Sequence, residues 1–208
     1  METSKTINST DGQAESQHQA GPEFILASSS PRRRQLLQEA GYQFQVAAPT
    51  IPEPDEALSG LSPAQQAESL AYFKARTVSD LHPGRYVVGA DTIVAIGAKV
   101  LGKPDDADHA RTLLQDLSGT RHSVITGLAV LAPDGRRIIA SDVTFVTMRP
   151  IAPQEIEQYI ASGEWIGKAG AYAIQETADR FVQSVEGSFS NVVGLPMELL
   201  ARMLERIK

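Results

Sequence analysis

The chain has 208 residues, of which 42% are hydrophobic and 21% are charged, as in an ordinary soluble globular protein. Its net charge of −6 argues against a general nucleic-acid binder, because contacts with phosphate backbones need a basic face. The absence of cysteine excludes disulfides, iron–sulfur clusters, thiolate zinc sites and a cysteine nucleophile. No apolar stretch reaches the length of a membrane span and no signal-peptide core opens the chain, so we expect a cytoplasmic protein without a membrane partner.

Residues 1–21 are polar and rich in Ser, Thr and Gln. Such a segment buries too little apolar surface to offset its ordering entropy, so we expect a disordered tail. Residues 22–208 contain neither an internal repeat nor a linker. The sequence therefore predicts one mixed α/β domain after the tail.

The hydrophobic periodicity predicts the elements of this domain in chain order. The first half contains a strand at 24–27, a helix at 32–40, a strand at 42–46, a loop at 47–61, a helix at 62–81, a strand at 86–96 and a helix at 105–117. The second half contains strands at 122–132 and 136–148, a helix at 153–161, strands at 169–175 and 181–185, and a helix at 196–207. Asp134-Gly135 is a strong hairpin signal between the two strands 122–132 and 136–148.

The turn between the first strand and the first helix combines hydroxyl groups with arginines, in the sequence Ser28-Ser29-Ser30-Pro31-Arg32-Arg33-Arg34. Ser30 is a candidate N-cap, and Pro31 suits the first helical position. Cations are unfavourable at the positive end of a helix dipole, and a bound anion would reverse that effect. The pattern favours an anion site over its alternative, a solvated basic face.

Three further positions fit a purely structural interpretation poorly. Asp91-Thr92 interrupts the apolar run 87–94, where an acid is rarely buried unless it is paired or binds a metal; the alternative is an Asp at a strand end or bulge. Lys74 falls on the apolar stripe of the predicted helix 62–81, and a snorkelling lysine is its alternative. Lys103 lies on a stiff turn between Gly102 and Pro104, where it could also be an ordinary surface lysine.

Together these residues predict a site for a phosphorylated substrate. Guanidinium and ammonium groups neutralise a polyphosphate, while a carboxylate holds a hard divalent cation such as magnesium or takes a proton from water. This combination favours hydrolysis of a phosphoanhydride over redox chemistry or acyl transfer.

The sequence from Phe24 to about Leu204 resembles the Maf family of nucleoside triphosphate pyrophosphatases. The resemblance rests on motifs whose order and spacing match the family: Ser28-Ser29-Ser30-Pro31-Arg32-Arg33, Gly89-Ala90-Asp91-Thr92, Leu101-Gly102-Lys103-Pro104, Leu117-Ser118-Gly119, 167–175 and 186–196. It implies an elongated α/β fold with a mixed, bent sheet flanked by helices and a nucleotide cleft between two lobes. It also implies a homodimer.

The resemblance implies hydrolysis of a nucleoside triphosphate to the monophosphate and pyrophosphate with a divalent metal, Mg or Mn. It places the proton acceptor on Asp91, a metal ligand on Glu53, and specificity positions on Arg32, Thr92 and Gln175. Substrate-binding positions are also implied at Ser28, Ser30, Arg33, Lys74 and Lys103.

The form Ala171-Tyr172-Ala173-Ile174-Gln175 resembles the branch of the family that acts on dTTP and UTP. Glu176-Thr177 stands where the family has a glycine, so we expect a narrower base pocket. Two alternatives remain: the same hydrolysis on modified nucleotides such as 7-methyl-GTP, and a non-catalytic nucleotide-binding regulator of cell division. Retention of Asp91, Lys74, Lys103 and Gln175 together favours the enzyme, because binding alone needs no proton acceptor.

Overall fold

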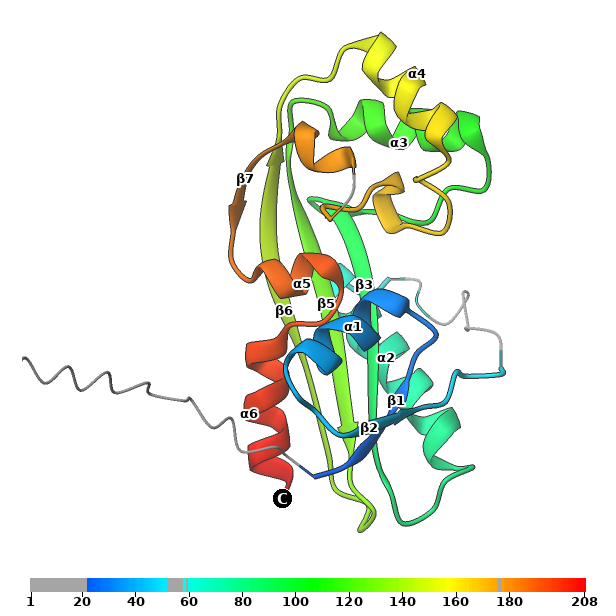
Figure 1. Cartoon of the computed structure of the whole chain (residues 1–208), viewed down its shortest axis with the longest axis vertical. Coiled ribbons are helices and arrows are strands. Elements are labelled where there is room, and N and C mark those ends of the chain that lie inside the picture. Colours follow the sequence, from blue (N-terminus) through cyan, green and yellow to red (C-terminus); the bar gives the residue numbers. More distant parts are fainter. Residues whose placement is uncertain (1–21, 52–57, 59, 176) are drawn as a thin grey trace, which may run out of the picture.

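A computed structural model describes residues 22–51, 58, 60–175 and 177–208 (Figure 1). The described residues form one seven-stranded sheet with the strand order β2-β1-β3-β5-β6-β7, and β4 pairs with β3 outside this path. The pairs β1–β2 and β1–β3 are parallel, and the other pairs are antiparallel. This confirms the predicted mixed sheet flanked by helices.

Helices and strands alternate along the chain. The first half contains β1 (Phe24–Ala27), α1 (Pro31–Glu39), β2 (Phe44–Val46), α2 (Pro63–Ser79), β3 (Tyr86–Ile96), β4 (Lys99–Leu101) and α3 (Ala107–Leu117). The second half contains β5 (Arg121–Leu131), β6 (Arg137–Met148), α4 (Pro153–Ser162), η2 (Ala169–Ala171), η3 (Thr177–Phe181), β7 (Val182–Glu186), α5 (Phe189–Val193) and α6 (Met197–Ile207).

The long strands β3, β5 and β6 run through two lobes (Figure 1). In the lobe that contains β1 and β2, α2 covers one sheet face, while α1 and α6 cover the other. Alternate residues of β1 therefore pack to opposite sides: Phe24 and Leu26 join the cluster with α6, whereas Ile25 and Ala27 join the cluster with α2. The second lobe builds its own core from α3, α4 and the far ends of the long strands.

A band of threonines separates the apolar clusters that lie on one face of the long strands. Thr92 of β3 is paired in register with Thr126 of β5, and Thr144 of β6 lies on the same face. Asn191 of α5 donates from Nδ2 to Thr144 Oγ1 at 2.9 Å and to the Val124 carbonyl at 3.0 Å. The two lobes are thus joined at this level by hydrogen bonds as well as by continuous strands.

Small residues bring α2 unusually close to the sheet. A Cβ atom added to Gly89 would lie 2.2 Å from the Ala71 carbonyl oxygen, and one added to Gly127 would lie 2.3 Å from that of Ala67. Both glycines therefore serve helix–sheet contact rather than a turn. Lys74 lies on α2 one turn after Leu70. The close approach of the helix therefore sets the distance between Lys74 and β3.

The edge of β3 changes partner in the middle of the strand. β1 pairs with β3 as far as Ala27 opposite Gly89, and β4 begins pairing with Leu101 opposite Val94. Between these partners Asp91 and Thr92 lie at the edge, while β5 still pairs with both on the other side. The predicted strand 86–96 is therefore confirmed as continuous: Asp91 and Thr92 interrupt only its apolar run, at the point where the neighbour on one edge ends.

Some sequence expectations were wrong in instructive places. Residues 169–175, predicted as a strand, form the short helix η2 followed by a turn, because Gly170 and Ala171 adopt positive φ values of 66° and 62°. The helix predicted to reach Leu81 ends at Ser79, and Leu81 is 67% exposed. Helix α5 was not predicted. Residues 1–21, expected to form a tail, lie outside the described residues.

Candidate active site

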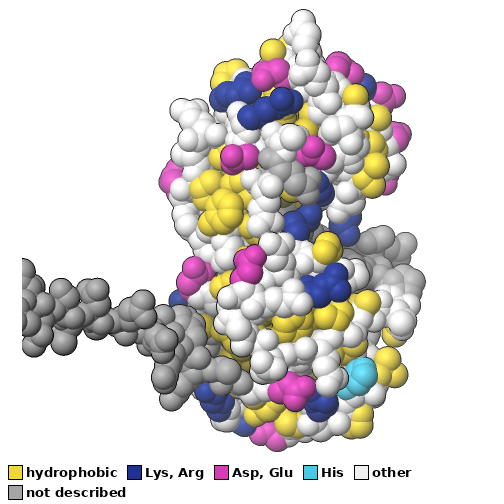
Figure 2. Space-filling model, viewed as in Figure 1, with side chains coloured by type: hydrophobic (Ala, Val, Ile, Leu, Met, Phe, Trp, Pro, Cys, Tyr) yellow, Lys and Arg dark blue, Asp and Glu magenta, His cyan; other side chains and the backbone are white. Residues whose placement is uncertain are grey.

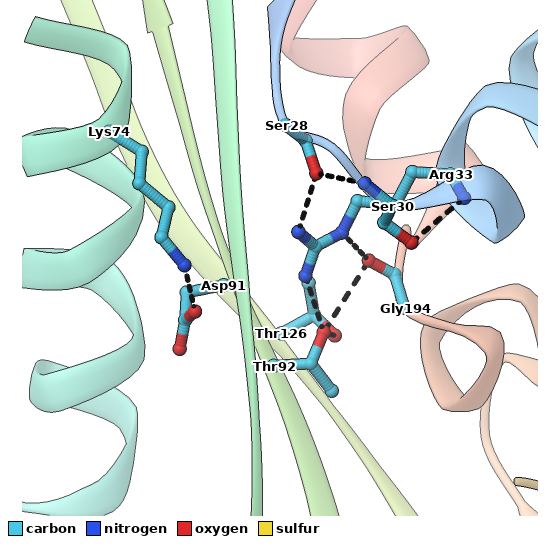
Figure 3. Close-up of polar contacts among 8 residues, drawn as sticks. All are labelled: Ser28, Ser30, Arg33, Lys74, Asp91, Thr92, Thr126 and Gly194. Atoms are coloured by element: carbon cyan, nitrogen blue, oxygen red, sulfur yellow. Dashed lines mark hydrogen bonds and ion pairs between the residues drawn. The ribbon is translucent and has the colours of Figure 1, made fainter. Parts of the chain in front are cut away.

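A cavity of about 550 Å³ opens where β3 changes its edge partner. One wall comes from the end of β1 and the start of α1, and another comes from Lys103 with residues 166–169 and 172–174. Residues 192–194, at the end of α5, close a third side. Because the cavity lies against an open strand edge, Asp91 and Thr92 both line it although successive side chains of a strand point to opposite faces (Figure 3).

The turn after β1 is organised by its own hydroxyl groups. Ser30 caps α1, its Oγ accepting from the Arg33 amide, and Pro31 occupies the first helical turn, as predicted. The buried Ser28 accepts at Oγ from the Ser30 amide at 3.2 Å. The first turn of α1 lines the cavity, so its backbone amides and positive dipole end favour an anion there.

Arg33 is buried, and its guanidinium connects three segments of the chain (Figure 3). Nε donates to the Gly194 carbonyl at 2.7 Å, Nη1 to Ser28 Oγ at 3.0 Å, and Nη2 to Thr92 Oγ1 at 3.0 Å. Thr92 Oγ1 in turn lies 2.9 Å from Thr126 Oγ1. Arg33 therefore ties the β1–α1 turn, β3 and the end of α5 into one rigid wall.

On the opposite face of β3, Lys74 and Asp91 form an ion pair. Lys74 Nζ lies 2.5 Å from Asp91 Oδ1, and the two side chains are only 12% and 13% exposed. The apolar stripe of α2 predicted that Lys74 faces inward, and the structure gives that inward charge a carboxylate partner. This pair is largely buried at the cavity, where a low local dielectric strengthens its interaction with a charged ligand.

The cavity is basic although the chain as a whole is acidic. Of the described residues that line it, five are cationic, namely Arg32, Arg33, Lys74, Lys103 and Lys168, and Asp91 is the single acid. Lysine and arginine side chains gather beside the hollow between the lobes (Figure 2). A basic cavity in a chain of net charge −6 concentrates anionic ligands locally.

The structure brings most of the predicted site residues to this cavity. Ser28, Ser30, Arg32, Arg33, Lys74, Asp91, Thr92 and Lys103 all line it. Gln175 is exposed and lies outside the lining, although its neighbours Ala173 and Ile174 belong to it. Glu53 lies outside the described residues.

Sequence reasoning gave no role to two groups at the cavity wall. Lys168 lines the cavity with 8% of its surface exposed, and only the motif around it pointed there. Tyr172, also in the lining, is bonded at its hydroxyl to His122 Nε2 at 2.7 Å. Burial raises the pKa of Tyr172 and lowers the pKa of His122 to about 4, so both groups are neutral at pH 7.

The described residues offer one carboxylate for a metal at this cavity. No three His, Asp or Glu side chains in the described part of the chain come together in a metal-binding cluster. Magnesium commonly uses one or two carboxylates together with substrate phosphates, so Asp91 with a bound polyphosphate fits such a donor set. None of the helices in the described part of the chain has the length and apolarity of a membrane span.

A family model described as Maf-like protein matches residues 23–207. A curated relative from Ruminiclostridium cellulolyticum, named dTTP/UTP pyrophosphatase, is 44% identical over 88% of this chain and 95% of its own length. A relative of the same name from Geobacillus sp. is 44% identical over 89% of this chain and 98% of its own length. The solved structure of the Staphylococcus aureus Ham1 protein shares the fold, with a TM-score of 0.52 and 13% identity over 89% of this chain and 100% of that one.

Proposed function

The chain belongs to the Maf family, and we propose that it hydrolyses nucleoside triphosphates, dTTP and UTP above all, to the monophosphate and pyrophosphate. The observation that carries this proposal is the basic cavity with its single described acid, Asp91, at an open strand edge. The names of relatives that are 44% identical over most of both chains support the same reaction and the same substrates.

In this proposal the cations bind the triphosphate. Arg33, Lys74 and Lys103 line the cavity from three different segments of the chain, so positive charge reaches the ligand from several sides. The first turn of α1 adds backbone amides and a positive dipole end. Arg33, together with Ser28 and Ser30, frames this wall and holds its shape around the phosphates.

Asp91 accepts the proton of the attacking water. One oxygen of the carboxylate, Oδ1, contacts Lys74, and the second is the group assigned to the water. As the water oxygen bonds to the α-phosphorus, its proton passes to Asp91 and the bond between the α-phosphorus and the bridging oxygen breaks. Pyrophosphate leaves with that oxygen, and general-base assistance of this kind contributes about 10²–10⁴-fold.

We propose that the reaction requires a divalent cation, Mg or Mn. Asp91 and Glu53 would hold it, and its chemistry would be neutralisation of charge on the substrate phosphates. Glu53 enters this proposal through the family resemblance alone.

Base selection is assigned to Gln175 with Arg32 and Thr92. Uracil and thymine present two carbonyl acceptors around one N–H donor, and a side-chain amide pairs with both kinds of group. A site built on such bonds rejects a base that leaves its polar groups unpaired. Arg32 and Thr92 line the cavity, and Gln175 directly follows the lining residue Ile174.

The proposal is tested by kcat/KM across dTTP, UTP, CTP, ATP, GTP and 7-methyl-GTP, with pyrophosphate release as the readout and Mg or Mn in turn. We expect dTTP and UTP to lead and EDTA to abolish turnover. A leading rate with CTP or 7-methyl-GTP would overturn the base-reading role of Gln175. Nucleotide binding without any pyrophosphate would favour the alternative of a non-catalytic regulator.

We further propose that the chain acts as a homodimer in the cytoplasm, where its proposed substrates are made and consumed, with residues 22–208 as one domain. Ile139, Val143 and Phe145 support the dimer because they are exposed apolar side chains on the same face of β6. Light scattering on a size-exclusion column measures the mass. A monomer at all concentrations would contradict this assignment.

A further inference from the structure

We infer that Glu164 and Thr177 form a positioning pair that holds Gln175 where it selects the base. The inference deepens the proposed function and rests on it for the role of Gln175. Two hydrogen bonds from Thr177 to one carboxylate oxygen carry it, together with the places of both residues beside the cavity wall. Neither Glu164 nor Thr177 belongs to the stretches on which the family resemblance rests.

Glu164 accepts two hydrogen bonds from the residue that opens η3. Its Oε2 accepts from the Thr177 amide at 3.1 Å and from the Thr177 hydroxyl at 2.7 Å. An amide at the start of a helix has no partner within that helix, so the carboxylate supplies the missing acceptor. Hydrogen bonds to an ionised group are stronger than those between neutral groups. The contact therefore fixes two segments, thirteen residues apart in the chain, against each other.

The turn that carries Glu164 is itself held by hydrogen bonds, so it serves as an anchor. It directly follows α4. The Glu164 amide donates to Ser162 Oγ at 3.3 Å, and Trp165 Nε1 donates to the Ile160 carbonyl at 3.0 Å. Two residues after Glu164, the chain enters the cavity lining at Ile166. The anchor is thus continuous with the wall of the site.

Gln175 lies between a buried residue and this contact. Ile174, directly before it, is 4% exposed and lines the cavity. Thr177 follows two positions after Gln175, and two residues of chain span at most about 7 Å. Gln175 itself is exposed, so burial does not orient it. The bonds from Thr177 to Glu164 therefore limit where the backbone of Gln175 lies, and with it the reach of the amide that is assigned to the base.

The same contact gives a role to a departure from the family. Glu176-Thr177 stands where the family has a glycine, and glycine leaves the backbone freer than any other residue does. In this chain Thr177 supplies a hydroxyl donor in addition to its amide, and Glu164 accepts from both. We therefore assign the departure to the restraint of Gln175.

Glu164→Ala tests the contact by removing the acceptor. The readout is the ratio of the Kd of CMP to the Kd of UMP, measured by calorimetry, because these nucleotides differ only at the base edge that Gln175 is assigned to read. We expect the ratio to fall about tenfold, the cost of about one hydrogen bond, through weaker binding of UMP. The Kd of inorganic pyrophosphate should stay unchanged. Thr177→Val, which keeps the amide, should lower the ratio less, and Glu164→Gln, which keeps a neutral acceptor, should restore part of it.

Two combined variants show whether the pair acts as inferred. Thr177→Val added to Glu164→Ala should lower the ratio no further, because the hydroxyl has then already lost its acceptor. Glu164→Ala added to Gln175→Ala should also change nothing, because the pair acts through Gln175. Glu157→Ala is the matched control: Glu157 lies on α4, is 55% exposed and pairs with Arg111 at 2.5 Å, so its loss should alter neither the ratio nor pyrophosphate binding.

An unchanged ratio in both Glu164→Ala and Thr177→Val would overturn the inference while leaving dTTP hydrolysis standing. An equal loss of affinity for UMP, CMP and pyrophosphate would also overturn it, because that result marks a general structural defect. A wild type that binds UMP and CMP alike would overturn the inference together with the base-reading role of Gln175. A wild type that prefers UMP but releases no pyrophosphate from dTTP would overturn the proposed reaction and leave the positioning pair standing.

Discussion

Asp91 and Thr92 are neighbours in the chain, yet the two sides of β3 that they occupy are built in different ways. On the Asp91 side, one helix approaches closely and supplies one ion pair from Lys74. On the Thr92 side, the hydroxyl belongs to a hydrogen-bonded band that includes Arg33 and Thr126. The first side holds a charge available for chemistry, and the second fixes the geometry around it.

This difference teaches how one strand edge serves both purposes. Because β1 ends at Ala27 and β4 begins pairing at Leu101, the edge between them is open to a ligand from both faces. A buried carboxylate needs a partner for its charge, and Lys74 is that partner for Asp91. Because the strand edge is open, Asp91 lines the cavity as well.

The largest expected effect comes from the Asp91 side. Asp91→Asn removes the proton acceptor while keeping an oxygen that accepts from Lys74. We expect kcat to fall about a hundredfold or more, with urea denaturation showing an intact fold. A folded variant with a near-normal rate would mean that Asp91 is not the base.

On the Thr92 side, the corresponding change should reduce stability as well as activity. Arg33→Lys cannot serve Ser28, Thr92 and Gly194 together, because an ammonium lacks the planar fork of a guanidinium. We expect a loss of about 3 kcal/mol in the free energy of unfolding, measured with urea, together with a lower kcat/KM. The exposed neighbour Arg34, changed to Lys, is the control. A stable Arg33→Lys variant would show that the band does not fix this wall.

The contact between α2 and the sheet offers a third test, which disturbs the Asp91 side of β3 without changing a residue of the Thr92 side. Gly89→Ala places a Cβ 2.2 Å from the Ala71 carbonyl oxygen, so α2 must move and carry Lys74 away from Asp91. We expect a loss of about 2 kcal/mol and a lower kcat, measured by thermal denaturation and steady-state kinetics. Gly127→Ala, which disturbs the same helix at Ala67, should reproduce the effect. An unchanged kcat in both variants would mean that the ion pair tolerates the shift.

A smaller, pH-dependent effect should come from His122, which lies on the Thr92 face. Burial lowers its pKa in the folded state from 6.5 to about 4. Between these two pH values His122 is neutral in the folded protein, whereas it binds a proton in the unfolded chain. Stability is therefore fully present above pH 6.5 and falls as the pH drops toward 4, by up to about 3 kcal/mol. His122→Gln should reduce this dependence in urea titrations at pH 7 and pH 4.5, whereas His82→Gln should keep it. Equal dependences in wild type and His122→Gln would contradict the assignment.

The sequence was informative where local chemistry decides structure. The hydroxyl turn at Ser28–Pro31 predicted the N-cap of α1, and the run from Tyr86 to Ile96 predicted β3 to the residue. The inward position of Lys74 followed from helical periodicity alone. These features depend on residues within one or two turns of each other.

The features that the sequence did not predict depend on contacts between segments that are distant in the chain. The open edge of β3 exists because β1 and β4 stop short of each other, and no local pattern encodes that register. The loop at 169–175 was misassigned as a strand because its apolar residues are buried without the alternation or dihedrals of a strand. The buried state of Lys168 follows from the same loop, so sequence reasoning could quote its motif without assigning it a role.

The central claim is that this cavity cleaves the bond between the α- and β-phosphates. The most direct measurement is the identity of the products of dTTP, resolved by anion-exchange chromatography over the time course of one reaction with Mg. We predict that dTMP and pyrophosphate accumulate in equal amounts from the first time point, without dTDP. Accumulation of dTDP with inorganic phosphate, or dTTP left intact by an enzyme that binds it, would contradict the account.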